Sequence, residues 1–169
     1  VMGQSVLAAD KKPLIADPLV EKAVRRWAEK PTGELTKADL EKVTRLHLDE
    51  TKITDVGLKD VAKLQKLTTL GLAYTKITDA GLEEVAKMKQ LQHLYLLDTQ
   101  VTDAGLKELA KLQKLTGLTL IHTKITDVGL KDIAKLQQLK LLYLHNTQIT
   151  DAGLKEAAKL QQLTTLGLG

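Results

Sequence analysis

The side chains most able to do chemistry in this chain are four histidines and three tyrosines, and their spacing is regular. His93 and Tyr95 alternate along one short segment, and Tyr143 and His145 alternate along another. All seven occupy the third, fifth, seventh or eighth position of a sequence that repeats every 24 residues. The other positions of the repeat are several times more numerous, so the pattern indicates that these side chains are gathered on one surface.

Imidazole groups bind metals, transfer protons and respond to mild acidity. A metal site needs three or four ligands that converge on one point. His93, His122 and His145 lie in neighbouring repeats and Asp98 is the nearest carboxylate candidate, but the chain contains no cysteine to join them. We therefore predict no metal and no cofactor, and we keep pH-dependent binding as an alternative role for the histidines.

The sequence contains none of the common catalytic motifs. It has no G-x-S-x-G segment, no H-E-x-x-H segment and no glycine-rich phosphate loop, and its only serine is Ser5. Aspartates recur at 24-residue intervals and look like paired carboxylates, but they fall at successive predicted helix starts, where capping explains them. They are Asp55, Asp79, Asp103, Asp127 and Asp151. We predict that the protein is not an enzyme.

The composition predicts one domain with an aliphatic core. The chain has 169 residues, of which 43% are hydrophobic, yet it has no phenylalanine and one tryptophan. Leucine must therefore fill most of the core. No uncharged apolar run approaches the roughly 20 residues that span a bilayer, so we predict no integral membrane segment.

The net charge of +4 is mildly basic. Lysines recur three residues after an acidic residue, at Lys63, Lys87, Lys111, Lys135 and Lys159. We interpret this column as a solvated helix face with weak ion pairs. Because acids interleave with the lysines and no aromatic side chain supports base stacking there, we predict no nucleic-acid partner.

Each repeat begins with the periodicity of a strand and continues with that of a helix. Leu94 and Leu96 alternate with outward-facing residues, as in a β-strand. Leu106 and Leu109 lie three residues apart on one helix face, after the N-cap Thr102. Five full repeats begin at residues 43, 67, 91, 115 and 139, and a partial sixth begins at residue 163.

One strand and one helix cannot bury their apolar sides alone, so we expect the repeats to stack. The strands align in parallel on one face, and the wider helices on the other face curve the stack toward the strands. We also expect the threonine after each strand to join a stacked ladder of hydroxyls. The glycine in each first helical turn is expected to allow a close approach of helix and strand.

The outward strand positions form the candidate binding face. Nothing in the packing of a stack requires tyrosine, histidine, leucine or isoleucine to face outward, whereas interfaces use such anchors ringed by polar groups. The alternative is that tyrosine merely suits exposed strands. The predicted ligand-binding residues are Arg45, His47, Tyr74, His93, Tyr95, Leu97, Ile121, His122, Leu141, Tyr143 and His145.

Three regions are predicted along the chain. Residues 1–10 are the remnant of a signal peptide or a disordered N-terminus, residues 11–42 form a helical N-terminal cap, and residues 43–169 form the repeats. Asp17 with Pro18 starts a helix in the cap, and Thr36 with Asp39 has the spacing of a capping box. Trp27 lies on the apolar face of the first helix, and we expect it in the core of the cap.

The pattern L-x-x-L-x-L, followed by I-T-D-x-G-L and a helix, resembles the leucine-rich repeat family from about Leu35 to Gly169. It is similar to the helix-containing repeats of ribonuclease inhibitor and of F-box leucine-rich proteins. Threonine stands here where those repeats often carry asparagine or cysteine, and there is no F-box-like segment, which argues against a ubiquitin-ligase role. The segment "DPLVEKAVRRWAEKPTGELTKADLEKVTRL" resembles the N-terminal caps of bacterial extracytoplasmic leucine-rich repeat proteins, including internalin-like ones.

The resemblance implies an α/β fold, a right-handed leucine-rich repeat solenoid with parallel strands on the concave face and helices on the convex face. It also implies an extracytoplasmic location, which is secreted, periplasmic or on the cell surface. We predict a non-enzymatic binding module that presents a rigid concave surface to a protein or peptide ligand. The alternatives are a glycan ligand, or a structural or surface spacer without a specific ligand. The partial last repeat leaves an open strand edge; we expect a monomer, with a weak edge-mediated dimer as the alternative.

Overall fold

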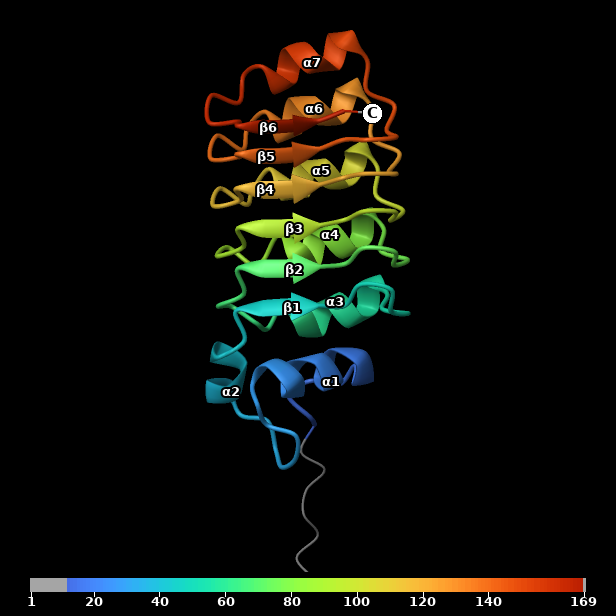
Figure 1. Ribbon diagram of the computed structural model, residues 1–169. Coiled ribbons are helices and arrows are strands. Elements are labelled where there is room, and N and C mark those ends of the chain that lie inside the picture. Colours follow the sequence, from blue (N-terminus) through green and yellow to red (C-terminus); the bar gives the residue numbers. More distant parts are fainter. Residues whose placement is uncertain (1–11, 169) are drawn as a thin grey trace, which may run out of the picture.

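The computed structural model describes residues 12–168, which form one stack of alternating strands and helices (Figure 1). The predicted signal-peptide remnant lies outside these described residues. The strands are β1 (Arg45–His47), β2 (Thr69–Gly71), β3 (His93–Tyr95), β4 (Gly117–Thr119), β5 (Leu141–Tyr143) and β6 (Thr165–Gly167). The helices are α1 (Pro18–Trp27), α2 (Lys37–Glu41), α3 (Asp55–Val61), α4 (Asp79–Val85), α5 (Asp103–Leu109), α6 (Asp127–Ile133) and α7 (Asp151–Ala157).

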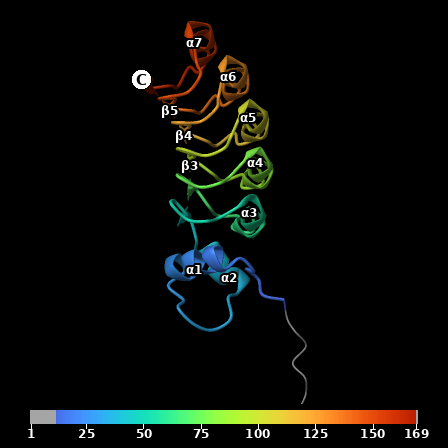
Figure 2. The same ribbon diagram turned by 90° about the vertical axis from the view of Figure 1, so that its right-hand side faces the viewer.

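The six strands of the described residues form one parallel sheet in chain order, β1-β2-β3-β4-β5-β6. Equivalent residues of neighbouring repeats pair with each other, as Leu70 does with Leu94. Each helix runs back behind its strand, which makes the connections right-handed (Figure 1). From the side, the strands line one face and α3–α7 line the other, and the stack bends toward the strands (Figure 2). The predicted right-handed solenoid with a strand-lined concave face is confirmed.

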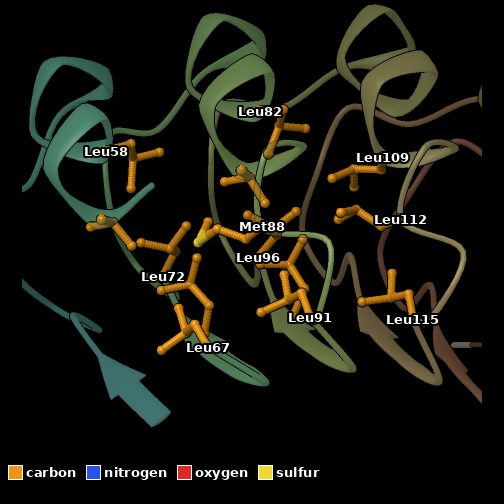
Figure 3. Close-up of a cluster of buried hydrophobic side chains, with 14 of the residues drawn as sticks. Leu58, Leu67, Leu72, Leu82, Met88, Leu91, Leu96, Leu109, Leu112 and Leu115 are labelled. Atoms are coloured by element: carbon orange, nitrogen blue, oxygen red, sulfur yellow. The ribbon is translucent and has the colours of Figure 1, made fainter. Parts of the chain in front are cut away.

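Leucines from both kinds of element fill the space between the sheet and the helices (Figure 3). Leu94 in β3 and Leu96 directly after it are fully buried, and so are Leu106 and Leu109 of α5. Each leucine packs between its equivalents in the repeats above and below, so one hydrophobic core runs through the whole stack.

β6 differs from the other strands in the burial of its leucines. Leu166 and Leu168 occupy the positions that are buried in every earlier repeat, but they are 37% and 44% exposed. No further strand packs against β6 within residues 12–168. Burial of the inward leucines therefore requires a packed neighbour on each side, which for β1 is the helical cap and for β2–β5 is another repeat.

The threonine after each strand closes a turn within its own repeat. Thr75, Thr99 and Thr123 are buried, and each hydroxyl donates to the carbonyl oxygen three residues earlier at 2.6–2.8 Å. The prediction of a hydroxyl ladder between repeats is therefore wrong, because the turn of the same repeat uses the hydroxyl hydrogen. The threonine instead supplies a partner to a carbonyl group where the strand ends.

The recurring glycine lies against the preceding helix. A β-carbon at Gly105 would lie 2.7 Å from Leu82 Cδ1 and 3.2 Å from Asp79 Cα, and both of those residues belong to α4. The close approach predicted between helix and strand is thus an approach between two consecutive helices. A side chain at this position would push α5 away from α4.

The aspartate that begins each of the helices α3–α6 binds the next repeat. Its two carboxylate oxygens accept the hydroxyl and the backbone amide of the N-cap threonine of the following helix, at 2.6–2.9 Å. The pairs are Asp55–Thr78, Asp79–Thr102, Asp103–Thr126 and Asp127–Thr150. At Asp127, these bonds from the Thr150 hydroxyl and amide lower the pKa of the carboxyl group. Helix capping alone therefore does not explain the aspartates, because they also link consecutive repeats.

Two helices cover the first repeat. α1 begins with Asp17 as its N-cap, and α2 begins with the predicted capping box of Thr36 and Asp39. Asp60 of α3 accepts two backbone amides from the segment that precedes α1, each at 2.7 Å. Burial works to raise the pKa of Asp60, but the hydrogen bonds from Lys63 and from these amides outweigh it and lower the pKa.

Trp27 is not in the core, which corrects the expectation from its spacing. Val20 and Val24 on the same helix are buried against the first repeat, but Trp27 is 40% exposed. Its ring centroid lies 6.2 Å from that of His47, an outward residue of β1. The last turn of α1 therefore faces the exposed side of the strand and not the leucine core behind it.

The lysine column makes the ion pairs that its spacing predicts. In each of the five repeats, the lysine Nζ lies 2.5–2.7 Å from the carboxylate three residues earlier. The five lysines are 42–64% exposed, so these pairs contribute little to stability.

Candidate functional site

The concave face consists of the outward side chains of the strands and of the residues that follow them. Parallel pairing aligns equivalent positions, so the side chains form rows that cross the strands. The first row is Arg45, Thr69, His93, Gly117 and Leu141, and the second is His47, Gly71, Tyr95, Thr119 and Tyr143. The third row is Asp49, Ala73, Leu97, Ile121 and His145, and the rim beside it is Glu50, Tyr74, Asp98, His122 and Asn146. All eleven residues predicted to bind a ligand lie in these rows or on the rim, and their role in binding stays a prediction.

Aromatic and aliphatic side chains occupy the middle of the concave face. Tyr95 is 39% exposed, while Leu97, Ile121, Leu141 and Tyr143 are half-buried. Their partial burial holds them in place and leaves one side open to solvent. Tyr95 and Tyr143 share a row and lie two strands apart, which is roughly 10 Å at the usual spacing of about 4.8 Å.

Two glycines let neighbouring side chains fold onto the sheet. A β-carbon at Gly117 would lie 2.7 Å from His93 Cδ2, and one at Gly71 would lie 2.7 Å from His47 Nδ1. Each imidazole ring therefore occupies the place that a side chain on the next strand would take. This role was not predicted from the sequence, although a glycine at an outward strand position is a signal for it.

The rim residues share an unusual backbone conformation. Their φ angles are 51–58°, in the left-handed region that asparagine, aspartate and histidine enter more readily than other residues with a side chain. Asp98, His122 and Asn146 fit that preference, but Glu50 and Tyr74 do not. Backbone preference therefore does not account for the tyrosine at the rim, and Tyr74 is 53% exposed.

The histidines have separate partners. His47 Nδ1 lies 3.1 Å from Asp49 Oδ2, and His122 Nε2 lies 3.1 Å from Asn146 Nδ2. The ring of His145 stacks with Tyr143 at a centroid distance of 6.3 Å. Among the described residues, no group of three or more histidine, cysteine, aspartate or glutamate side chains is arranged to hold a metal ion.

The end of the concave face nearest α1 is polar and hollow. A hollow of about 360 Å³ lies at this end, over the outward sides of β1, β2 and β3. Its lining residues are Arg45, His47, Thr68, Thr69, Gln92, His93 and Tyr95. The face thus changes from polar and charged at β1 to more apolar at β4 and β5.

Known proteins share both the repeat and the fold. Residues 40–62 and 63–86 each match the leucine-rich repeat family. The crystal structure of internalin C2 from Listeria monocytogenes is similar over 92% of this chain and 75% of that chain, with 28% sequence identity and a TM-score of 0.68. The stack has the fold of a leucine-rich repeat solenoid, and two of its repeats match the family itself. No curated protein matches it.

The leucine-rich repeats of this chain separate scaffold from surface. The residues that recur in every repeat, such as Leu94 and Asp79, make the core or join neighbouring repeats. The residues that vary from repeat to repeat, such as Tyr95 and His122, lie on the concave face or its rim. Among the helices of residues 12–168, none has the length and apolar character to cross a membrane.

Proposed function

We propose that this leucine-rich repeat protein is a non-enzymatic module that binds a protein or peptide ligand on its concave face. The observation that carries the proposal is the position of its aromatic and imidazole side chains. All three tyrosines and all four histidines lie on the concave face or its rim, together with outward Leu97, Ile121 and Leu141. Aromatic and aliphatic anchors within a polar surround are what protein interfaces use.

Rigidity is the proposed mechanism of binding. The leucine core and the aspartate–threonine pairs hold each strand at a fixed distance from the next. The anchors are partly packed before a ligand arrives, so little side-chain entropy is lost when they are covered. A ligand that lies across the strands would contact Tyr95 and Tyr143 together with the apolar residues between them.

An extracytoplasmic location of a bacterial protein belongs to the same proposal. It is supported by the resemblance of residues 17–46 to bacterial caps and by the similarity to internalin C2. We propose a monomer, with edge pairing at β6 as the alternative. Molar mass from light scattering at high protein concentration distinguishes the two states.

The test is a random peptide library panned on the immobilised protein. We expect enriched peptides to bind the wild type and to lose at least about tenfold in affinity for Tyr95→Ala combined with Tyr143→Ala, because each anchor contributes about 1 kcal/mol or more. The melting temperature should change little. The matched control is Val56→Ala combined with Val128→Ala, which removes two exposed apolar side chains from the convex helices.

Other outcomes assign other functions. Equal binding by the tyrosine variant and the wild type would remove the concave face as the site. Failure to enrich any peptide, together with specific retention of sugars on a glycan array, would favour the glycan alternative, since tyrosine and histidine rings also suit sugars. Failure of both assays would favour a spacer.

A further inference from the structure

A pocket of about 480 Å³ lies between α1 and β1, apart from the tyrosine centre of the concave face. Leu48, which is 1% exposed, and Ala23 give it apolar lining. The rings of Trp27 and His47 line it as well, with an angle of 37° between their planes. A side chain that enters this pocket meets apolar atoms and two aromatic faces.

Two cations complete the pocket. Lys22 and Arg26 lie four residues apart and thus on one side of α1. Within residues 12–168, neither side chain makes an ion pair or a hydrogen bond, whereas Arg25 on the same helix is paired with Glu21 at 2.8 Å. The pocket therefore carries two cationic side chains that form no ion pair with a carboxylate of the described residues.

The carboxylate near His47 does not change this balance. Asp49 accepts the backbone amide of Ala73 at 2.8 Å and is bonded to His47 Nδ1 at 3.1 Å. It is not among the residues that line the pocket. The charge of the pocket is complementary to an anion that comes from outside the chain.

Trp27 gives the pocket its affinity for an apolar group. A helix that only covered the first repeat would bury its largest apolar side chain, as it buries Val20 and Val24, yet Trp27 is 40% exposed. Tryptophan and arginine are the residues most enriched at the energetic centres of interfaces. An exposed indole beside an unpaired guanidinium is such a combination.

We propose that this pocket is a second binding site, which takes an acidic peptide segment. An aromatic or aliphatic side chain of the segment lies between Trp27 and His47, and a carboxylate next to it binds Lys22 and Arg26. The proposal rests on the proposed function in one respect, because it assumes that the ligand is a peptide. It adds the chemistry of that peptide and its direction on the protein.

The direction follows from His47, which lines both this pocket and the hollow that reaches Tyr95. The path from Trp27 past His47 to Tyr95 is up to roughly 16 Å, which about five extended residues cover at about 3.3 Å each. The acidic end of a ligand thus lies at α1, and its apolar end lies over Tyr95 and the residues beyond.

The test uses the fluorescence of Trp27, the only tryptophan of the chain. The probe is the pentapeptide acetyl-Asp-Glu-Phe-Glu-Asp-amide, and its matched control is acetyl-Asn-Gln-Phe-Gln-Asn-amide. We expect a saturable change in fluorescence with a midpoint at or below about 1 mM for the acidic peptide. The amide peptide should bind at least tenfold more weakly, and added salt should weaken the acidic peptide alone.

Two variants locate the charges. Lys22→Gln with Arg26→Gln should weaken the acidic peptide at least tenfold. Lys59→Gln with Lys107→Gln removes the same charge from the exposed face of α3 and α5 and should leave binding unchanged. The Tyr95→Ala, Tyr143→Ala variant should still respond to the pentapeptide, so this proposal and the proposed function fail separately.

Several results would overturn the proposal. They are equal binding of the acidic and amide peptides, no fluorescence change up to 5 mM peptide, or full binding by the Lys22→Gln, Arg26→Gln variant. A response to inorganic phosphate that matches the response to the acidic peptide would also overturn it, because the pocket would then be a simple anion site.

Discussion

The carboxylate of Asp79 accepts the hydroxyl of Thr102 at 2.6 Å and the backbone amide of Thr102 at 2.8 Å. Asp79 begins α4 and Thr102 is the N-cap of α5, so the two bonds join the N-termini of consecutive helices. Gly105 permits the contact, because a β-carbon there would meet Asp79. The pair therefore fixes the distance between neighbouring repeats on the convex side.

Removal of one such pair should weaken the stack. We expect Asp103→Ala to lower the free energy of unfolding by about 2 kcal/mol, because hydrogen bonds to a charged group are lost and the amide of Thr126 keeps no partner in their place. The measurement is urea denaturation followed by circular dichroism. The control is Asp151→Ala at the same repeat position, which should change stability by less than about 0.5 kcal/mol. Similar losses in both variants would mean that helix capping, and not the link between repeats, is the source.

The position of a leucine in the stack should decide its contribution. Leu96→Ala should cost about 2–5 kcal/mol, because Leu96 is fully buried and its removal leaves a cavity. Leu168 has the same place in its repeat but is 44% exposed, so Leu168→Ala should cost less than about 1 kcal/mol. Thermal unfolding of both variants beside the wild type gives the comparison. A small loss for Leu96→Ala would show that the core can collapse around the gap.

Patterns that act within one repeat could be predicted from the sequence. The alternation around Leu94 depends on a single strand, and the spacing of Leu106 and Leu109 depends on a single helix. The inward orientation that each pattern predicts is confirmed, because all three leucines are fully buried. Contacts between repeats were not predictable in this way. The bond from Asp79 to Thr102 joins residues 23 positions apart, and it depends on the rise from one repeat to the next. A repeat read by itself carries no information on that rise.

In the candidate site too, features that depend on a single element could be predicted, and features that depend on contacts between elements could not. Parity along a strand places Tyr95 and Tyr143 on the outward side, so their rows could be predicted. The exposure of Trp27 could not, because its helical spacing is that of a buried residue and only the placement of α1 against β1 leaves it open. The role of Gly117 could not be predicted either, because it depends on the position of the His93 ring, which belongs to the neighbouring strand.

Tyr74 at the rim has a backbone conformation that tyrosine adopts at a cost, and replacing it tests how large that cost is. We expect Tyr74→Asn to raise the free energy of unfolding by about 0.5–1 kcal/mol, because asparagine adopts the left-handed conformation at lower cost. The same variant should bind a concave-face peptide more weakly. Asn146→Ala, at the same rim position, should be less stable than the wild type. If Tyr74→Asn gave no gain in urea denaturation, packing of the tyrosine ring would have to offset its backbone strain.

Asp39 should make the fold sensitive to acid. The hydrogen bond from Lys30 Nζ, at 2.7 Å, and those from the hydroxyl and amide of Thr36 hold the pKa of Asp39 well below its usual value. A carboxyl group with a lower pKa in the folded chain than in the unfolded chain stabilises the fold at pH values above the unfolded pKa, which is about 4. That contribution disappears as the pH falls toward the folded pKa.

We therefore expect the urea midpoint of the wild type to fall between about pH 4 and pH 2. Asp39→Asn should be less stable at pH 7, and its midpoint should fall less over the same range, because one carboxyl group no longer takes up a proton. Lys30→Met should move the loss to higher pH, since the pKa of Asp39 rises once the neighbouring ammonium group is gone. Parallel curves for the wild type and Asp39→Asn would contradict this account and would assign the acid sensitivity to other carboxyl groups, among which Asp60 and Asp127 also have lowered pKa values.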